Sequence, residues 1–246
     1  MAVVALASPI FTKEYSNSKK NGRDIVLVID TSGSMQQGSF DMSDPLKNKF
    51  DVVKEVASDF VERRESDRIG LITFADVAFV ASPLTFEKEF LVKIINMQRL
   101  GIAGQKTAIN DALVQSYSML ENSPSTSKVV ILLTDGIDNM SRVSLEDAVH
   151  LIGLSDIKLY TIGIGTTRDF DGRALKAFAK AGTGEFFAAS DSATLQKIYD
   201  KIDALETSQL DDKKIVQTKY LFAYPLLVAI LSLLLFVYFR VMGSLR

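Results

Sequence analysis

The chain has 246 residues, of which 28 are basic and 30 acidic, with a net charge of −2 and no cysteine. This length accommodates one well-buried α/β domain of about 180 residues together with shorter appendages. The balanced charge lacks the strong positive excess that is typical of proteins that bind nucleic acid. A chain without cysteine forms no disulfides.

Residues 1–23 divide into an apolar stub and a polar linker. The stub, MAVVALASPIFT, is too short to cross a bilayer of about 30 Å and lacks the positive start of a signal peptide. We interpret it either as the outer end of a membrane helix that begins before this sequence, or as a terminal segment that packs locally. Residues 13–23, KEYSNSKKNGR, are expected to link it to the first strand.

The first predicted strand ends in a cluster of oxygen ligands. Residues 25–29 are all Val, Leu or Ile, which is typical of a central parallel strand covered on both faces. Asp30, Ser32 and Ser34 follow at alternate positions, and Gly33 allows a tight bend. One carboxylate and two hydroxyls can therefore converge beyond the strand, although a polar turn with a helix cap accounts for the same residues.

These ligands favour a hard divalent cation. The chain has no cysteine and its only histidine, His150, lies far along the sequence, so zinc, copper or iron would find almost no ligands. A site with few carboxylates and open positions is more typical of Mg²⁺ than of a Ca²⁺ cage with six to eight oxygens. The predicted cofactor is Mg²⁺, with Mn²⁺ as the alternative.

Strand and helix patterns alternate along the rest of the domain. Apolar residues at helical spacing predict helices over 46–64, 86–97, 107–121, 145–154, 171–181 and 193–205. A hairpin at one sheet edge and three further strands are predicted over 68–74 and 77–80, and over 129–133, 157–164 and 184–188. The alternation predicts a doubly wound α/β fold with a mostly parallel sheet and helices on both faces.

Two of these elements add oxygen ligands. Thr107 opens the helix 107–121 after a glycine-containing loop, and Asp135 follows the apolar run 129–133. Because the carboxyl ends of parallel strands meet at one edge of a sheet, these side chains can lie beside Asp30 at a topological switch point, where such sheets bind ligands.

This ordered set resembles the von Willebrand factor A (VWA) domain and its metal-ion-dependent adhesion site (MIDAS), whose pattern is D-x-S-x-S, then a threonine, then an aspartate after a later strand. The resemblance places the VWA domain at 24–208. The matching residues are Asp30, Ser32, Ser34, Thr107 and Asp135.

The resemblance implies a mode of binding without catalysis. The serines would ligate the metal directly, the threonine when a partner is bound, and the aspartates directly or through water, while an acidic side chain of a protein partner completes the coordination. Lys106 stands where the family usually has a small residue before the threonine. This cation can weaken metal binding or contact an acidic partner, and both readings remain open.

The composition changes after residue 208. Residues 209–219 are expected to form a lysine-containing stem, and 220–240 include the uncharged segment 221–239 with aromatic residues at both ends. At about 1.5 Å per residue this segment spans about 30 Å, so we predict a transmembrane helix over 220–240 and a short tail over 241–246. A buried core helix would rarely be this long without a polar face.

The whole arrangement resembles the bacterial membrane-anchored aerotolerance (Bat, BatA-like) family. This resemblance implies an inner-membrane protein with a periplasmic VWA domain, a role in stress tolerance or envelope maintenance, and contacts with other VWA proteins and a MoxR-type AAA+ ATPase. The lysines before the predicted span outnumber the arginines after it, which by the positive-inside rule favours a cytoplasmic domain instead.

Two other classes of function stay open at this point. Mg²⁺ beside an aspartate that follows a strand also describes a metal-dependent phosphoryl hydrolase. A dehalogenase-type hydrolase would, however, need a carboxylate where Ser32 stands, and the chain has no P-loop and no Ser-His-Asp pattern that His150 could serve. The remaining alternative is a membrane scaffold whose metal site is vacant.

Overall fold

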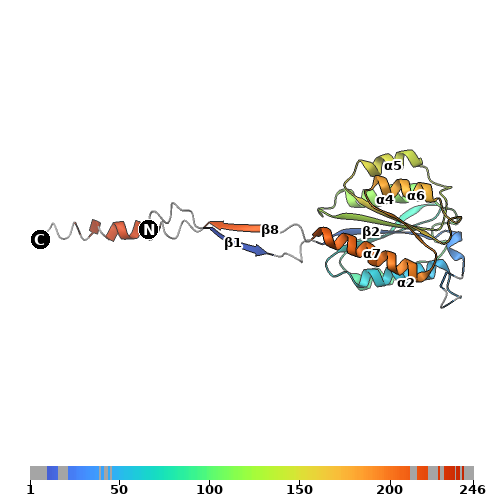
Figure 1. Ribbon diagram of the computed structural model, residues 1–246, viewed down its shortest axis with the longest axis horizontal. Helices are drawn as coiled ribbons and strands as arrows, with labels where there is room; N and C mark the ends of the chain where they lie inside the picture. Colours follow the sequence, from blue (N-terminus) through green and yellow to red (C-terminus); the bar gives the residue numbers. More distant parts are fainter. Residues whose placement is uncertain are drawn as a thin grey trace. The chain divides into compact units, whose positions relative to one another are not determined.

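The computed structural model of the chain describes residues 10–15, 22–38, 40, 41, 44, 46–210, 215–220, 227, 230–235, 237, 238 and 240. The chain divides into two units. The larger one, Ser18–Leu210, holds a six-stranded sheet with its helices, and the smaller one, Met1–Asn17 with Asp211–Arg246, holds a two-stranded ribbon (Figure 1).

The sheet of the larger unit is mostly parallel. Its strand order is β4-β3-β2-β5-β6-β7, and only the edge strand β4 runs antiparallel to its neighbour. The strands are β2 (Asp24–Asp30), β3 (Arg68–Phe74), β4 (Ala78–Thr85), β5 (Lys128–Thr134), β6 (Lys158–Ile164) and β7 (Phe186–Ala189). The predicted α/β fold and its edge hairpin are confirmed.

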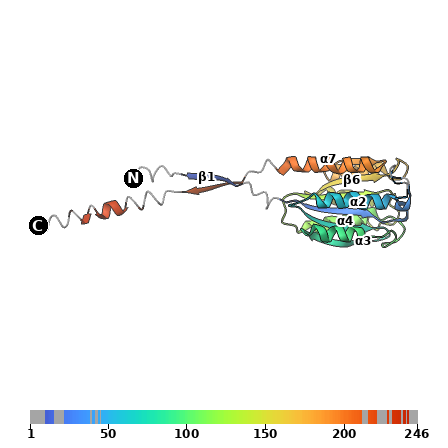
Figure 2. The ribbon, with the colours of Figure 1, turned by 90° about the horizontal axis from the view of Figure 1, so that it is seen from below.

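Helices cover both faces of this sheet. α4, α5 and α6 lie over one face, and α2 and α7 over the other (Figure 1). The view of that second face shows α2 between α7 and α3 (Figure 2). The helices are η1 (Gly33–Gln36), α2 (Lys49–Glu62), α3 (Lys88–Met97), α4 (Ile109–Glu121), α5 (Leu145–Gly153), α6 (Gly172–Ala181) and α7 (Ser192–Leu210).

The central strands β2 and β5 are apolar because both of their faces are buried. Successive strand side chains point to opposite faces, so Ile25, Leu27 and Ile29 join the core beneath α2 and α7, whereas Val26 and Val28 join the core beneath α4 and α6. Burial of each such side chain stabilises the fold by about 1.5–3 kcal/mol. The buried centre of the sheet therefore lies directly before the residues that are predicted to bind the metal.

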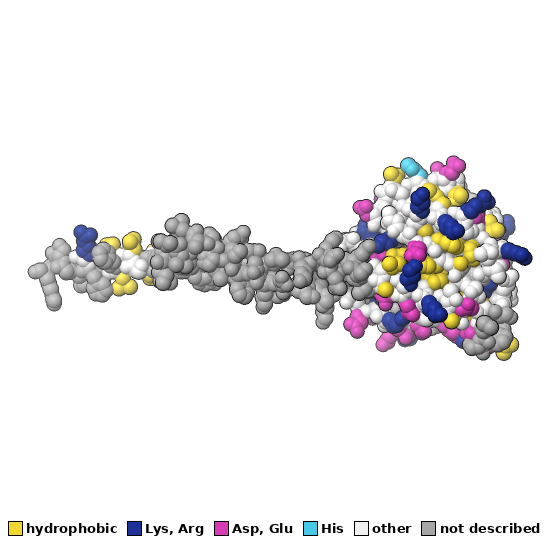
Figure 3. All heavy atoms as spheres, in the orientation of Figure 1, with side chains coloured by type: hydrophobic (Ala, Val, Ile, Leu, Met, Phe, Trp, Pro, Cys, Tyr) yellow, Lys and Arg dark blue, Asp and Glu magenta, His cyan; other side chains and the backbone are white. Residues whose placement is uncertain are grey.

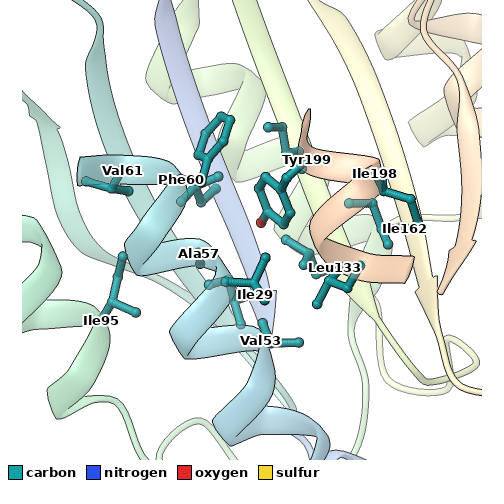
Figure 4. Close-up of a cluster of buried hydrophobic side chains, with 14 of the residues drawn as sticks. Ile29, Val53, Ala57, Phe60, Val61, Ile95, Leu133, Ile162, Ile198 and Tyr199 are labelled. Carbon is teal, nitrogen blue, oxygen red and sulfur yellow. The ribbon is translucent and has the colours of Figure 1, made fainter. Parts of the chain in front are cut away.

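The core between α2 and α7 is shown in Figure 4. Phe60 of α2 and Tyr199 of α7 are fully buried, and their ring centroids lie 4.8 Å apart. Strand residues Ile29, Leu133 and Ile162 complete this layer. Both helices are thus fixed against the strands that carry the predicted site.

The smaller unit contains a ribbon that the sequence analysis did not predict. β1 (Ile10–Tyr15) pairs antiparallel with β8 (Ile215–Tyr220), in a register that places Ile10 opposite Tyr220 and Tyr15 opposite Ile215. These strands fall where a stub and linker (1–23) and a stem (209–219) were expected.

Within the part of the chain that the structure describes, no helix is both long and apolar enough to cross a membrane. Ten residues of the predicted span 220–240 lie outside this part, namely 221–226, 228, 229, 236 and 239, and so do residues 1–9 of the stub and the whole tail 241–246. The transmembrane helix therefore stays a prediction.

Candidate metal site

The predicted ligands gather at the carboxyl ends of β2 and β5. These strands are adjacent and parallel, so the residues that terminate them come side by side. Asp30 ends β2 and Asp135 directly follows β5, and both side chains are buried. Two carboxylates are thereby placed together at one edge of the sheet.

Hydrogen bonds connect these carboxylates to the serines of the loop after β2. The Ser32 backbone N–H donates to Asp30 Oδ1 at 2.8 Å, and the Ser32 and Ser34 hydroxyl oxygens lie 3.0 Å apart. The Ser34 hydroxyl in turn donates to Asp135 Oδ1 at 2.6 Å. Four of the five predicted ligands therefore form one connected network.

Burial changes the ionisation of Asp30. Desolvation raises its pKa to about 6, against hydrogen bonds from Ser32 and from the Thr134 hydroxyl, which lies 2.6 Å from Asp30 Oδ2; the nearby charge of Asp135 raises the pKa further. A buried carboxylate with such a pKa gains from a nearby cation. Carboxylate and hydroxyl oxygens are ligands that suit Mg²⁺ or Mn²⁺.

The fifth predicted ligand, Thr107, lies two residues before the first residue of α4 and against the loop after β5. Its backbone N–H donates to Asn139 Oδ1 at 3.0 Å, and its backbone oxygen accepts from the Asn139 N–H at 3.0 Å. A Cβ on Gly136 would come 2.9 Å from the Thr107 hydroxyl oxygen, so the glycine leaves room for this side chain. The structure thus brings all five predicted residues to the same edge.

The loop before Thr107 depends on Gly104. This glycine has φ +118°, and a Cβ on it would overlap the Asp76 carboxylate. That carboxylate accepts the backbone N–H groups of Gln105 and Lys106, while the Gln105 backbone oxygen accepts from the Gly33 N–H at 3.2 Å. The loops after β2 and before α4 are consequently held together.

Exposed apolar side chains stand on the loops that carry the site. They come from the β3–β4 turn, the loop before α4 and the loop after β5: Val77, Ile102, Ile137 and Met140. The Lys106 ammonium lies on the surface, 3.8 Å from the Met140 sulfur. This arrangement offers a partner apolar contacts beside a cation.

Lys49 and Asp169 also lie at this edge of the sheet, and neither was predicted from the sequence. Lys49, the first residue of α2, has a side chain only 5% exposed, with its ammonium 2.9 Å from Asp135 Oδ2 and 3.5 Å from Asp169 Oδ2. Nothing in the sequence indicates that Lys49 is buried, because a lysine beside Phe50 at the start of an amphipathic helix is ordinarily exposed. Its two acidic partners, Asp135 and Asp169, lie 86 and 120 residues further along the chain.

No described group of three or more His, Cys, Asp or Glu side chains is placed to hold a metal ion. Any cation at Asp30 and Asp135 would therefore depend on hydroxyls, water and outside ligands as well. His150 lies exposed on α5, seen as the cyan side chain in Figure 3. On the face in that figure, basic side chains are interspersed with acidic ones and form no single basic patch.

The mostly parallel sheet, the helices on both of its faces and the acidic and hydroxyl side chains at its carboxyl edge define a doubly wound α/β domain with a candidate binding site at that edge. The family model of the von Willebrand factor type A domain matches residues 24–201, and the chain belongs to this family.

Relatives with bacterial and animal origins share this domain. An uncharacterized protein of Borreliella burgdorferi is 31% identical over 210 residues, which are 85% of this chain and 60% of that protein. An aerotolerance-related membrane protein of Bacteroides fragilis has the same fold, with a TM-score of 0.62 at 19% identity over 73% of this chain and 98% of that one. Proximal thread matrix protein 1 of the mussel byssus, solved with a zinc-occupied MIDAS motif, is 25% identical with a TM-score of 0.64, over 89% of this chain and 51% of that one.

Proposed function

We propose that this chain captures an acidic side chain of a protein partner through a divalent cation. Mg²⁺, with Mn²⁺ as the alternative, would be held by Asp30, Ser32, Ser34, Thr107 and Asp135. Their carboxylate and hydroxyl oxygens would supply only part of the ligands that such a cation needs, so water would fill the remaining positions and a partner's carboxylate could replace one water. The site is a binding site and not a catalytic one.

The observation that carries this proposal is the network from Asp30 through the two serines to Asp135. It joins oxygen ligands from two strands within hydrogen-bond distance before any partner arrives. Only two of the five predicted ligands are carboxylates, so a dication held there would be close to neutral, and a partner's carboxylate would meet less repulsion than at a site with three or more acidic ligands. The metal-occupied motif of the mussel protein supports a metal at the corresponding place.

The apolar rim of Val77, Ile102, Ile137 and Met140 supports a protein as the partner. An acidic side chain flanked by apolar ones would bind the metal with its carboxylate and bury its neighbours against this rim. Lys106 adds a positive charge at the same surface, which favours an acidic partner over a basic one.

We propose further that the domain is anchored to the bacterial inner membrane by 220–240, with its VWA domain on the periplasmic side. The fold that it shares with an aerotolerance-related membrane protein supports association with a membrane. On this view the chain acts in a Bat-type complex for stress tolerance or envelope maintenance, with other VWA proteins and a MoxR-type AAA+ ATPase as candidate partners.

The proposal is tested by titrating Mg²⁺ into the full-length wild-type chain and into Asp30→Ala and Asp135→Ala, with heat as the readout. We expect one site per chain in the wild type and loss of binding in both variants. Asp147→Ala, which removes an exposed carboxylate in the first turn of α5, is the control and should bind as the wild type does. Equal binding by all four proteins would refute the assignment of the site.

A further inference from the structure

Lys49 is a buried cation inside the candidate metal site. Its ammonium lies 2.9 Å from Asp135 Oδ2 and 2.7 Å from Gln37 Oε1, and its side chain is only 5% exposed. A buried ammonium needs such partners, because removing it from water is costly. The backbone of α2 fixes the lysine here, since its neighbour Phe50 is packed in the core.

The lysine occupies a carboxylate oxygen of Asp135 that a metal ion could otherwise bind. Asp135 Oδ1 already accepts from the Ser34 hydroxyl, and Oδ2 accepts from Lys49. A dication brought to Asp135 is repelled by the ammonium, and both compete for the same carboxylate charge. Lys49 therefore opposes the metal instead of helping to hold it.

Asp169, in the loop between β6 and α6, offers the lysine a second anion. Its Oδ2 lies 3.5 Å from the Lys49 ammonium and accepts the Thr166 backbone N–H at 2.7 Å. Partial desolvation acts to raise the pKa of Asp169, but the Thr166 hydrogen bonds and the Lys49 charge lower it overall, so this carboxylate is ionised at neutral pH.

We propose that Lys49 competes with the metal ion for Asp135. The Lys49 ammonium pairs with Asp135 until a dication binds that carboxylate, and the ammonium then pairs with Asp169. This inference rests on the proposed function and adds a control of its affinity. A partner's carboxylate relieves the repulsion between metal and ammonium, so the metal and the acidic partner bind cooperatively. The lysine thereby keeps the site weak for metal alone.

The first test compares Mg²⁺ titrations of the full-length wild type and Lys49→Met. The inference predicts an affinity at least about tenfold higher in the variant, the size expected when one close like charge is removed. Lys47→Met is the matched control: it removes the same charge two residues away, where the lysine pairs with Glu55 outside the site, and should leave the affinity unchanged. Equal or weaker binding by Lys49→Met would overturn the inference.

The second test uses Asp169→Asn in both backgrounds and keeps the inference open to refutation if Lys49→Met folds poorly. Without Asp169 the displaced ammonium has no second carboxylate, so the Mg²⁺ affinity of the wild-type background should fall about threefold to tenfold. In the Lys49→Met background the same substitution should change the affinity less than about twofold. An unchanged affinity in the wild-type background contradicts the role given to Asp169.

A purely structural role for Lys49 is separated by thermal unfolding in Mg²⁺ and in chelator. If the lysine only supports the fold, Lys49→Met lowers the midpoint equally in both conditions; if it competes with the metal, Mg²⁺ raises the midpoint more in the variant than in the wild type. If the wild type binds Mg²⁺ and Lys49→Met binds it with the same affinity, this inference is refuted but the proposed function is not. Absence of Mg²⁺ binding in every protein refutes the proposed function and this inference with it.

Discussion

Gly104 sets the conformation of the loop that leads to Thr107. Its φ of +118° suits glycine, and a Cβ would overlap the Asp76 carboxylate that holds this loop. We predict that Gly104→Ala lowers the free energy of unfolding by about 1–3 kcal/mol and abolishes Mg²⁺ binding.

Denaturant unfolding and calorimetry check this prediction against Gly153→Ala at the end of α5. A Cβ on Gly153 meets nothing within 4 Å, so this control should be unchanged or more stable by about 0.4–1 kcal/mol and should bind Mg²⁺ normally. If both variants bind Mg²⁺ like the wild type, the loop before Thr107 is not part of the site.

Two buried tyrosines differ in what their hydroxyls contact. The Tyr199 hydroxyl of α7 has no hydrogen-bond partner among the described residues, whereas the Tyr160 hydroxyl lies 2.6 Å from Glu206 Oε1. We predict that Tyr199→Phe keeps or raises the free energy of unfolding by up to about 1 kcal/mol, and that Tyr160→Phe lowers it by about 1–3 kcal/mol. Urea unfolding measures both; a loss in Tyr199→Phe as large as in Tyr160→Phe would contradict this assignment.

Some residues of the candidate site could be predicted from the sequence, and one could not. Asp30, Ser32 and Ser34 stand within five positions behind an apolar strand, so their convergence follows from local geometry. Thr107 and Asp135 could be added because parallel strands bring their ends to one edge. Lys49 could not, since only the tertiary packing of α2 against β5 reveals that its ammonium meets Asp135.

At the level of elements, a side-chain cap fixes the start of α6 beside the loop of Asp169. The Asp171 carboxylate accepts the backbone N–H groups of Arg173 at 2.9 Å and Ala174 at 3.2 Å. We predict that Asp171→Ala lowers the free energy of unfolding by about 1 kcal/mol. Asp171→Asn retains an accepting oxygen and should lose much less in the same unfolding experiment. Equal losses in the two variants would show that the cap is not what the aspartate contributes.

The elements that could be predicted are those with strong local patterns. β2 and β5 are uninterrupted apolar runs, and the helices of the domain have amphipathic spacing, so both appear near their predicted positions. β1 and β8 read IFTKEY and IVQTKY, which mix polar and apolar residues over short stretches. Their pairing joins segments about two hundred residues apart, and neither segment alone indicates its partner.

At the level of the whole molecule, the ribbon pairs one strand that precedes the VWA domain in sequence with one strand that follows it. Thr12 of β1 lies directly opposite Thr218 of β8 in the observed register. The chain has no cysteine, so Thr12→Cys with Thr218→Cys introduces the only thiols. We predict that this pair forms an intramolecular disulfide on mild oxidation. The Cβ atoms of directly opposed residues in an antiparallel pair lie only about 4.5–5.5 Å apart, so a small adjustment brings the two sulfurs into bonding distance.

Gel mobility with and without reductant checks this cross-link. Thr12→Cys with Val216→Cys is the control, since Val216 lies opposite Glu14 and the diagonal distance is too long for a disulfide. Equally efficient cross-linking of both pairs would show that the register is wrong or slips.

In the proposed binding mode, a metal held at Asp30 and Asp135 coordinates a carboxylate from outside the chain. This binding mode is tested most directly by the paramagnetic relaxation of ¹³C-carboxyl acetate in the presence of Mn²⁺ and the full-length chain. We predict strong relaxation of the carboxyl carbon with the wild type, loss of this effect in Asp30→Ala with Asp135→Ala, and reversal by excess Mg²⁺. If Mn²⁺ is bound by the protein but acetate relaxation is the same with the wild type and with the double variant, this binding mode is wrong.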